Sequence, residues 1–189
     1  MDKQISLLKF YSVDDSFIKD LHDNVNNHVF VNNNPKYHHS RKYIGLVLSI
    51  NGFSYYAPMS SPKNSDYIEI KGKRMIRNSI LPIIRMVEVD SNGQKSLLGT
   101  IKLGNMIPVP ESKLINYDLN NEQDLNYKAL VLKEKRFINR HKELITTYAE
   151  ALYNKKVSGK STNRYLKATF DYKKFENYVM QHYSTQNNG

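Results

Sequence analysis

Two apolar runs, Tyr43–Ile50 and Phe53–Met59, are separated only by the dipeptide Asn51-Gly52. This connection is the strongest short-range signal for a β-hairpin, because a type I′ turn needs positive φ angles at both central residues. Pro58 and Pro62 then oppose a continuing strand, since proline cannot donate to a central ladder. The sequence therefore predicts a hairpin whose second strand ends near these prolines.

Two hydroxyl groups and an ammonium group stand where this hairpin releases the chain: Ser60, Ser61 and Lys63. A rigid hairpin could hold them around an oxyanion such as a phosphate, because charge-assisted hydrogen bonds favour that ligand. A plain Ser-Ser-Pro turn with a solvated lysine fits the same residues. The spacing alone leaves both interpretations open.

The segment that leads into the hairpin, Pro35–Lys42, is dense in groups that suit phosphate chemistry. Its candidate residues are Lys36, Tyr37, His38, His39, Arg41 and Lys42. Metal-free RNA cleavage needs a base for the 2′-hydroxyl, a donor for the leaving oxygen and cations for the phosphorane. The segment and the turn together contain each type. An exposed histidine pair and surface charge are the alternative interpretations.

Strand and turn patterns predict a β-rich region over residues 7–110. The expected strands are Leu7–Val13, Val29–Val31, Tyr67–Ile70, Arg85–Val89, Leu97–Leu103 and Met106–Pro110. A turn is expected at Gly72–Arg74, and Asp90–Gly93 marks a second hairpin. Neighbouring strand residues point to opposite faces, so only one of Tyr55 and Tyr56 is expected in the core. The pattern favours an antiparallel sheet or small barrel.

Helices are expected on either side of this region. Asp14 or Asp15 caps an early helix that ends near Asp23, with Phe17, Ile18 and Leu21 on one face. Glu122–Tyr153 has the 3.6-residue period of one long helix, or of two with a break, and Asn120 or Asn121 could cap it. Asp171 caps a last helix that carries Phe175, Val179 and His182. We expect one α+β domain over residues 1–189, helical over 120–183.

Basic charge is concentrated in the helical half. The chain has 28 Lys and Arg against 18 Asp and Glu, a net charge of +10, and residues 131–167 hold ten basic and three acidic side chains. This excess favours a polyanionic partner. The candidate RNA-binding residues are Lys36, Lys42, Lys133, Arg136, Arg140, Lys155, Lys156, Lys160 and Arg164. A non-catalytic RNA-binding module and a DNA-binding regulator are alternatives to an enzyme.

Several classes of site are not expected. The chain has no cysteine, clustered carboxylates, nucleotide-binding glycine motif, signal peptide or long apolar run. We therefore expect no metal, no cofactor and no membrane, and a cytoplasmic protein. Arg136 and His141 fit the Arg-x4-His pattern of HEPN ribonucleases, but that fold is all-helical and the two predicted hairpins oppose it.

Three blocks of sequence resemble the ToxN/AbiQ family of endoribonuclease toxins, from type III toxin–antitoxin and phage abortive-infection systems. They are Phe10-Tyr11 with the helix around Phe17-Ile18, then Tyr43–Lys63, then Leu98–Pro108. The resemblance covers roughly residues 7–153. It implies a strongly twisted antiparallel sheet or barrel, similar to MazF/Kid toxins, flanked by helices.

The resemblance also implies a function. It implies metal-independent cleavage of cellular or phage RNA to a 2′,3′-cyclic phosphate and a 5′-hydroxyl. A repeated, folded antitoxin RNA would inhibit the toxin by occupying its active-site groove. Release of the toxin during phage infection would then kill or arrest the infected bacterium.

Individual residues match the family's functional positions. Ser61 and Lys63 match its critical serine and lysine, and Ser60 stands where relatives have threonine or serine. Tyr37 falls at a family tyrosine. Arg41 aligns with a functional lysine, although Lys42 could fill that role after a shift of one residue. Phe17 departs from the pattern, because a relative has tyrosine there, so any role of a hydroxyl at that position is lost.

Overall fold

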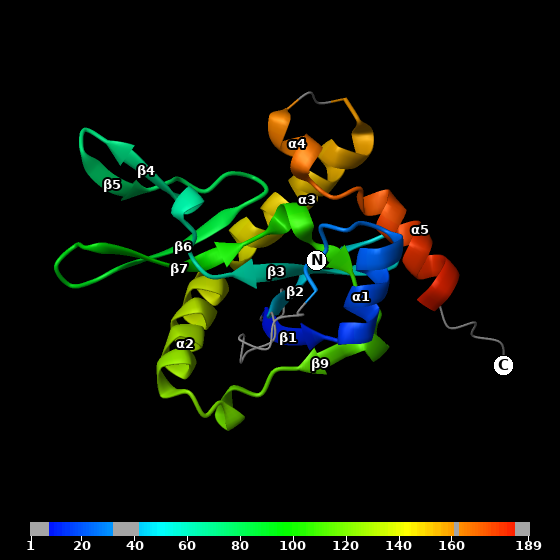
Figure 1. Cartoon of the computed structure of the whole chain (residues 1–189), viewed down its shortest axis with the longest axis horizontal. Coiled ribbons are helices and arrows are strands. Elements are labelled where there is room, and N and C mark those ends of the chain that lie inside the picture. The colour runs from blue at the N-terminus through cyan, green and yellow to red at the C-terminus, as the bar shows by residue number, and fades with distance from the viewer. Residues whose placement is uncertain (1–7, 32–41, 161–162, 184–189) are drawn as a thin grey trace, which may run out of the picture.

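A computed structural model describes residues 8–31, 42–160 and 163–183 (Figure 1). Nine strands and five helices lie in these ranges. In chain order they are β1 Lys9–Val13, α1 Asp15–Asn24, β2 Tyr43–Ile50, β3 Phe53–Ser60, β4 Tyr67–Ile70, β5 Lys73–Ile76, β6 Ile84–Val89, β7 Lys95–Ile101, β8 Ile107–Pro108, β9 Leu114–Asn116, α2 Leu125–Arg140, α3 Lys142–Ser158, α4 Arg164–Ala168 and α5 Tyr172–Tyr183. The expected α+β class, with a helical C-terminal half, is confirmed.

The main sheet is antiparallel and has β3 at its centre. Its strand order is β6-β7-β3-β2-β1-β9, and the short β8 also pairs with β3. Along β3, Tyr55 and Tyr56 pair with residues of β8, whereas Met59 and Ser60 pair with residues of β7. Within the described ranges the two outer strands β6 and β9 do not pair with each other, so no barrel closure is seen. The barrel alternative is thus not supported, whereas the sheet is confirmed.

The central hairpin forms as its turn residues predict. Asn51 and Gly52 have φ angles of 52° and 79°, and the pairing of Ile50 with Phe53 closes the two-residue loop. The register between β2 and β3 shifts between Ile44 and Leu48. The hairpin that carries the candidate site is therefore irregular at this point, as at a β-bulge.

Both faces of β3 are covered, which makes one expectation wrong. Tyr55 is fully buried, with its ring centroid 5.8 Å from that of Tyr153 in α3 and 5.7 Å from that of Tyr172 in α5. Tyr56 points to the opposite face, yet it is only 6% exposed, and its ring packs edge-to-face on Tyr11 of β1. Because the sheet has no solvated face here, both tyrosines belong to the core.

Other departures lie in short or polar segments of the β-rich region. Val29–Val31 forms no strand. The expected turn at Gly72–Arg74 lies earlier, at Lys71 and Gly72, so that β5 starts at Lys73. The β-rich region extends past Pro110, because β9 pairs with β1.

The helices follow the sequence pattern with corrections at their ends. Asp14 accepts the Phe17 N–H at 2.9 Å and so caps α1 as expected. The cap of α2 is Asp124, which accepts the Tyr127 N–H at 3.0 Å, rather than Asn120 or Asn121. The long helical stretch is two helices that meet at His141.

The last helix, α5, begins after Asp171, whose carboxylate accepts the Lys174 N–H. Phe175 and Val179 are buried as expected, whereas His182 is exposed. Across the described ranges, every helix is too short or too polar to cross a membrane.

Candidate active site

A cavity of about 330 Å³ lies at the end of β3. The polar part of its lining consists of His28, Tyr43, Ser60, Lys63, Lys102 and Asn105. Phe30 and Phe170 contribute aromatic surface to the wall. The residues of this lining carry two ammonium groups, two hydroxyl groups, an imidazole and an amide.

Strand alternation explains which residues of β3 reach this cavity. Pro58 and Ser60 lie two residues apart, so they share the face to which Tyr56 also points. Across the strands, Ser60 pairs with Thr100 of β7, and their hydroxyl groups are 2.9 Å apart. The cavity thus lies on the face of the sheet opposite to that of Tyr55.

The structure brings Ser60 and Lys63 together, while Ser61 stands between them. Ser61 is exposed and is not among the residues that line the cavity. Lys63 opens a short 3-10 turn, Asn64–Asp66. Its backbone N–H donates to Asp66 Oδ2 at 3.0 Å, and the Asp66 N–H donates to the Lys63 carbonyl oxygen at 2.9 Å. The lysine backbone is therefore fixed although its side chain is exposed.

Sequence reasoning did not identify Lys102, Asn105 or His28 as site residues. Lys102 follows β7, and its N–H donates to the Pro58 carbonyl oxygen at 3.0 Å, which places it beside the end of β3. The Asn105 N–H donates back to the Lys102 carbonyl oxygen at 3.0 Å. Both residues lie in Leu98–Pro108, the third block of the family resemblance, and this block was the one sequence signal that could have identified them. His28 lies in a polar loop with no comparable pattern.

Five predicted residues cannot be placed beside this cavity. Lys36, Tyr37, Arg41 and the pair His38-His39 lie outside the described ranges. The structure therefore neither joins them to Ser60 and Lys63 nor separates them.

Lys42 is described, and its position corrects two expectations. It is 6% exposed, its ammonium lies 4.1 Å from the ring centroids of both Tyr117 and Tyr127, and it donates to the Tyr127 hydroxyl. The next residue, Tyr43, lines the cavity, so strand alternation turns Lys42 to the other face of the sheet. In this structure Lys42 neither substitutes for Arg41 nor offers a free surface to RNA.

Burial changes the acid–base properties around Lys42. Burial lowers the Lys42 pKa to about 8, against the opposing pull of the nearby Glu122 and Glu134 carboxylates. Burial raises the pKa of Glu134 to about 7, although the charge of Lys42 opposes this change. Glu134 approaches the sheet at Gly99, where a Cβ atom would lie 2.8 Å from its Oε1. The pair therefore joins α2 to the sheet behind the cavity.

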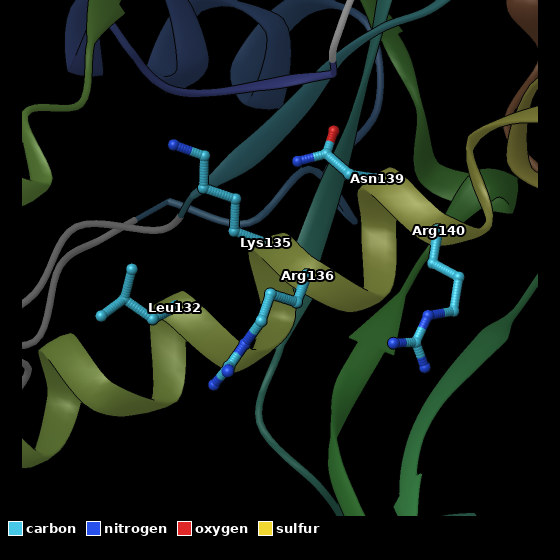
Figure 2. Close-up of a pocket in the computed structure, with 5 residues that line it drawn as sticks. All are labelled: Leu132, Lys135, Arg136, Asn139 and Arg140. Atoms are coloured by element: carbon cyan, nitrogen blue, oxygen red, sulfur yellow. The ribbon is translucent and has the colours of Figure 1, made fainter.

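A second cavity, of about 560 Å³, lies along one side of α2 (Figure 2). Leu132, Lys135, Arg136, Asn139 and Arg140 line it, and Figure 2 shows their side chains leaving successive turns of the helix. Within the described part of the chain, the buried Asn139 Oδ1 has no hydrogen-bond partner. The cavity therefore combines cationic side chains with apolar surface.

The other predicted RNA-binding residues differ in what they contact. Lys133 pairs with Glu88 at 2.6 Å, and the Lys156 ammonium donates to the Leu166 carbonyl oxygen at 2.8 Å. The remaining three of this set are exposed: Lys155, Lys160 and Arg164. In the Arg-x4-His pattern noted above, the ring of His141 stacks on that of Phe137, with centroids 4.1 Å apart. Among the residues described, no group of three His, Asp or Glu side chains gathers as metal ligands do.

The family profile described as "Toxin ToxN, type III toxin-antitoxin system" matches residues 9–180. "Endoribonuclease ToxN" of Pectobacterium atrosepticum is 31% identical over 157 residues, which cover 81% of this chain and 84% of that relative. "Endoribonuclease AbiQ" of Lactococcus lactis subsp. lactis is 30% identical over 171 residues, which cover 89% of this chain and 86% of that relative. Identity to these two relatives is thus nearly equal.

The fold is also similar to that of a solved structure. The structure described as "A processed non-coding RNA regulates a bacterial antiviral system" has a TM-score of 0.73 to this chain at 27% sequence identity. The match covers 89% of this chain and 95% of the other. The shared fold therefore extends over most of this chain.

Proposed function

The chain belongs to the ToxN family of type III toxin–antitoxin endoribonucleases, and from this premise we propose that it cleaves RNA without a metal ion. The proposed products carry a 2′,3′-cyclic phosphate and a 5′-hydroxyl. One observation carries the proposal: a single cavity gathers the Ser60 hydroxyl and the ammonium groups of Lys63 and Lys102. Such a set of donors suits the phosphate of an RNA backbone.

In the proposed step, the 2′-oxygen attacks the adjacent phosphorus. A bond from phosphorus to the 2′-oxygen forms as the bond to the 5′-oxygen breaks, so no co-reactant is consumed. Negative charge grows on the non-bridging oxygens in the transition state, where fixed cations have their largest effect. Lys63 and Lys102 would stabilise this charge, and Ser60 and Ser61 would position the phosphate.

Two protons must also move. The attacking 2′-hydroxyl gives its proton to a base, and the leaving 5′-oxygen receives a proton from a donor. We assign proton transfer to Tyr37, which matches a family tyrosine, and phosphate binding to Arg41, which aligns with a functional lysine of the family. His28 is a further candidate, because it lines the cavity and an imidazole can either accept or donate a proton.

We also propose that a repeated, folded antitoxin RNA inhibits the enzyme by occupying the active-site groove. In abortive infection, the released toxin would act in the cytoplasm on cellular or phage RNA. The matched solved structure concerns a non-coding RNA in an antiviral system, which supports this proposal. The exposed cations of α2, exemplified by Arg136 and Arg140, provide further phosphate-binding surface.

The test incubates purified protein with a mixed RNA in EDTA and maps the new ends. We expect cuts at a recurring short motif, with cyclic-phosphate ends. Lys63→Ala should lower the rate by about 100-fold or more, as for removal of a transition-state donor. Ser61→Ala and Lys102→Ala should also slow cleavage, whereas Lys95→Ala, an exposed lysine in β7, should not.

Three results would overturn parts of the proposal. Cleavage that appears only after Mg²⁺ is added would contradict the metal-free step. Full activity of Lys63→Ala would remove the cavity from the mechanism. RNA that is bound but left intact would identify a non-catalytic basic RNA-binding protein.

A further inference from the structure

Lys63 stands on an exposed turn, yet the proposed chemistry needs its ammonium at a fixed place beside Ser60. Ser60 ends β3 and is therefore held by the sheet, whereas Ser61, Pro62 and Lys63 are exposed. Misplacing a catalytic group by about 1 Å can cost about 100-fold in rate. The fold must therefore fix this turn by contacts beneath it.

The contact beneath the turn is the buried carboxylate of Asp66, which is 1% exposed. One of its oxygens, Oδ2, accepts the backbone N–H of Lys63 at 3.0 Å. Its other oxygen, Oδ1, accepts Nε of Arg85 at 3.2 Å and lies 3.1 Å from Arg85 Nη2. The two oxygens therefore connect the catalytic turn to a second buried side chain.

Both the backbone and the guanidinium group of Arg85 are held by hydrogen bonds. It is 7% exposed and lies on β6. Its Nη1 donates to the Asn78 carbonyl oxygen at 2.7 Å, and its backbone N–H donates to Ser79 Oγ at 2.8 Å. The guanidinium is thus a rigid anchor for the Asp66 carboxylate.

The register of the sheet connects this anchor to the other end of the turn. Arg85 is paired with Thr100 of β7, and Thr100 is paired with Ser60 of β3. Directly paired residues lie on the same face, so these three side chains form one row across three strands. The hydroxyl groups of Ser60 and Thr100 are 2.9 Å apart, and strand pairing places Thr100 beside Arg85. Arg85 in turn contacts Asp66, which binds the Lys63 backbone.

The energetics of a buried ion pair favour a geometric role over a stabilising one. Taking both charges out of water costs several kcal/mol per ion, and apolar replacements are often neutral or stabilising. Charge-assisted hydrogen bonds from two guanidinium nitrogens to one carboxylate oxygen do, however, fix direction and distance. The ion pair of Asp66 and Arg85 lies directly beneath Lys63, where a fixed direction and distance would matter for the reaction.

We propose that Asp66 and Arg85 are positioning residues, which hold the Lys63 ammonium in register with Ser60 for phosphodiester cleavage. The proposal rests on the function proposed above. Neither side chain needs to touch the RNA. Asp66 acts through the Lys63 backbone, and Arg85 acts through Asp66.

The test is a double-mutant cycle of Asp66→Asn and Lys63→Ala, measured as kcat and KM on an RNA with the mapped cleavage motif. A carboxamide has one oxygen, so Asn at 66 can serve Lys63 or Arg85 but not both. We expect Asp66→Asn alone to lower kcat by about 10- to 100-fold with little change in KM. In the Lys63→Ala background the same substitution should have little further effect.

A matched control separates this effect from a general loss of stability. Glu176 is 3% exposed and accepts the Tyr55 and Tyr153 hydroxyls at 2.9 and 2.6 Å, on the face of β3 away from the cavity. Glu176→Gln should reduce thermal stability but leave kcat unchanged below its unfolding transition. An equal loss of kcat in Glu176→Gln would overturn the proposal.

Amide hydrogen exchange provides a second measurement that does not depend on turnover. In both Asp66→Asn and Arg85→Met, hydrogen exchange at the Lys63 amide should accelerate at least about tenfold. The amide of Ile101 in β7 serves as the reference, because its exchange rate reports global unfolding. Unchanged Lys63 exchange, or rate losses that multiply in the double mutant, would refute the positioning role. Full activity of Lys63→Ala would instead contradict the proposed function itself.

Discussion

Glu134 and Lys42 are charged side chains that the fold encloses between α2 and the sheet. Burial acts on them in opposite directions, because it disfavours the charged form of each: it raises the carboxyl pKa to about 7 and lowers the ammonium pKa to about 8. Their ionisation near neutral pH is therefore linked to the packing of α2, one layer behind the candidate active site.

This linkage predicts a pH-dependent stability. The folded chain holds the Glu134 proton more tightly than the unfolded chain, so the stabilisation is complete below the ordinary carboxyl pKa of 4.5 and is lost as the pH rises through the folded-state pKa of about 7. Between pH 5 and 8, the unfolding free energy of the wild type should fall relative to that of Glu134→Gln by on the order of 2 kcal/mol.

Urea unfolding at several pH values would measure this difference. Glu150→Gln, an exposed acid on α3, is the control and should parallel the wild type throughout. If the unfolding free energies of Glu134→Gln and the wild type also change in parallel with pH, the pKa of Glu134 is not raised in the folded chain.

At the scale of elements, the contact between β2 and β3 depends on the absence of a side chain. A Cβ atom at Gly45 would lie 1.9 Å from Cδ1 of Tyr56, which is a buried ring on the cavity face of β3. Gly45→Ala should therefore displace this ring and destabilise the protein by about 1–3 kcal/mol, as overpacking does.

Chemical denaturation would test this prediction. Ser49→Ala, at an exposed position of the same strand, should leave the midpoint unchanged. A Gly45→Ala midpoint equal to that of the wild type would mean that the hairpin accommodates the methyl group. Because Ser60 lies on the same face as Tyr56, we also expect cleavage by Gly45→Ala to slow.

Elements with local signals were predictable, and those that depend on distant contacts were not. Asn51-Gly52 fixes its hairpin through its own φ angles, and Asp14 caps α1 through a neighbouring N–H. Strand β9 has only three residues and gains its structure from pairing with β1, about a hundred residues earlier. The break at His141 has no glycine or proline to mark it.

The candidate site divides in the same way. Ser60 and Lys63 follow directly from the hairpin, so the sequence pattern indicates them together. Lys102 reaches them only because β7 pairs with β3, and Asp66 and Arg85 were not predicted because their partners depend on the three-strand register. Tyr55 and Tyr56 were misjudged because one sequence cannot show that both faces of a sheet are covered.

For the whole molecule, part of the basic charge behind the net +10 lies on surfaces outside the cavity. Arg136 and Arg140 are exposed on α2, and Lys155 and Lys160 are exposed at the end of α3 and just beyond it. A bound polyanion could therefore contact the protein at points well separated from the scissile phosphate.

The salt dependence of RNA binding tests this. If Arg136 and Arg140 each contact a phosphate, Arg136→Gln/Arg140→Gln should reduce the slope of log Kd against log salt by about 1.4, at about 0.7 per single-stranded contact. The charge-matched control Lys19→Gln/Lys95→Gln should leave the slope unchanged. Equal reductions in both double mutants would indicate general electrostatic attraction rather than a binding face.

The β4–β5 ribbon leaves the molecule at Asp66 and returns at Arg77, whose N–H donates to the Asp66 carbonyl oxygen at 2.9 Å. Figure 1 shows it extending away from the main sheet, beside the β6–β7 hairpin. The ribbon also contacts the turn that holds Lys63, because the Arg74 guanidinium of β5 donates to Asn64 Oδ1 at 3.2 Å. A loop that replaces the ribbon must therefore preserve two contacts, the backbone hydrogen bond at Asp66 and the side-chain contact at Asn64, if the turn at Lys63 is to keep its place.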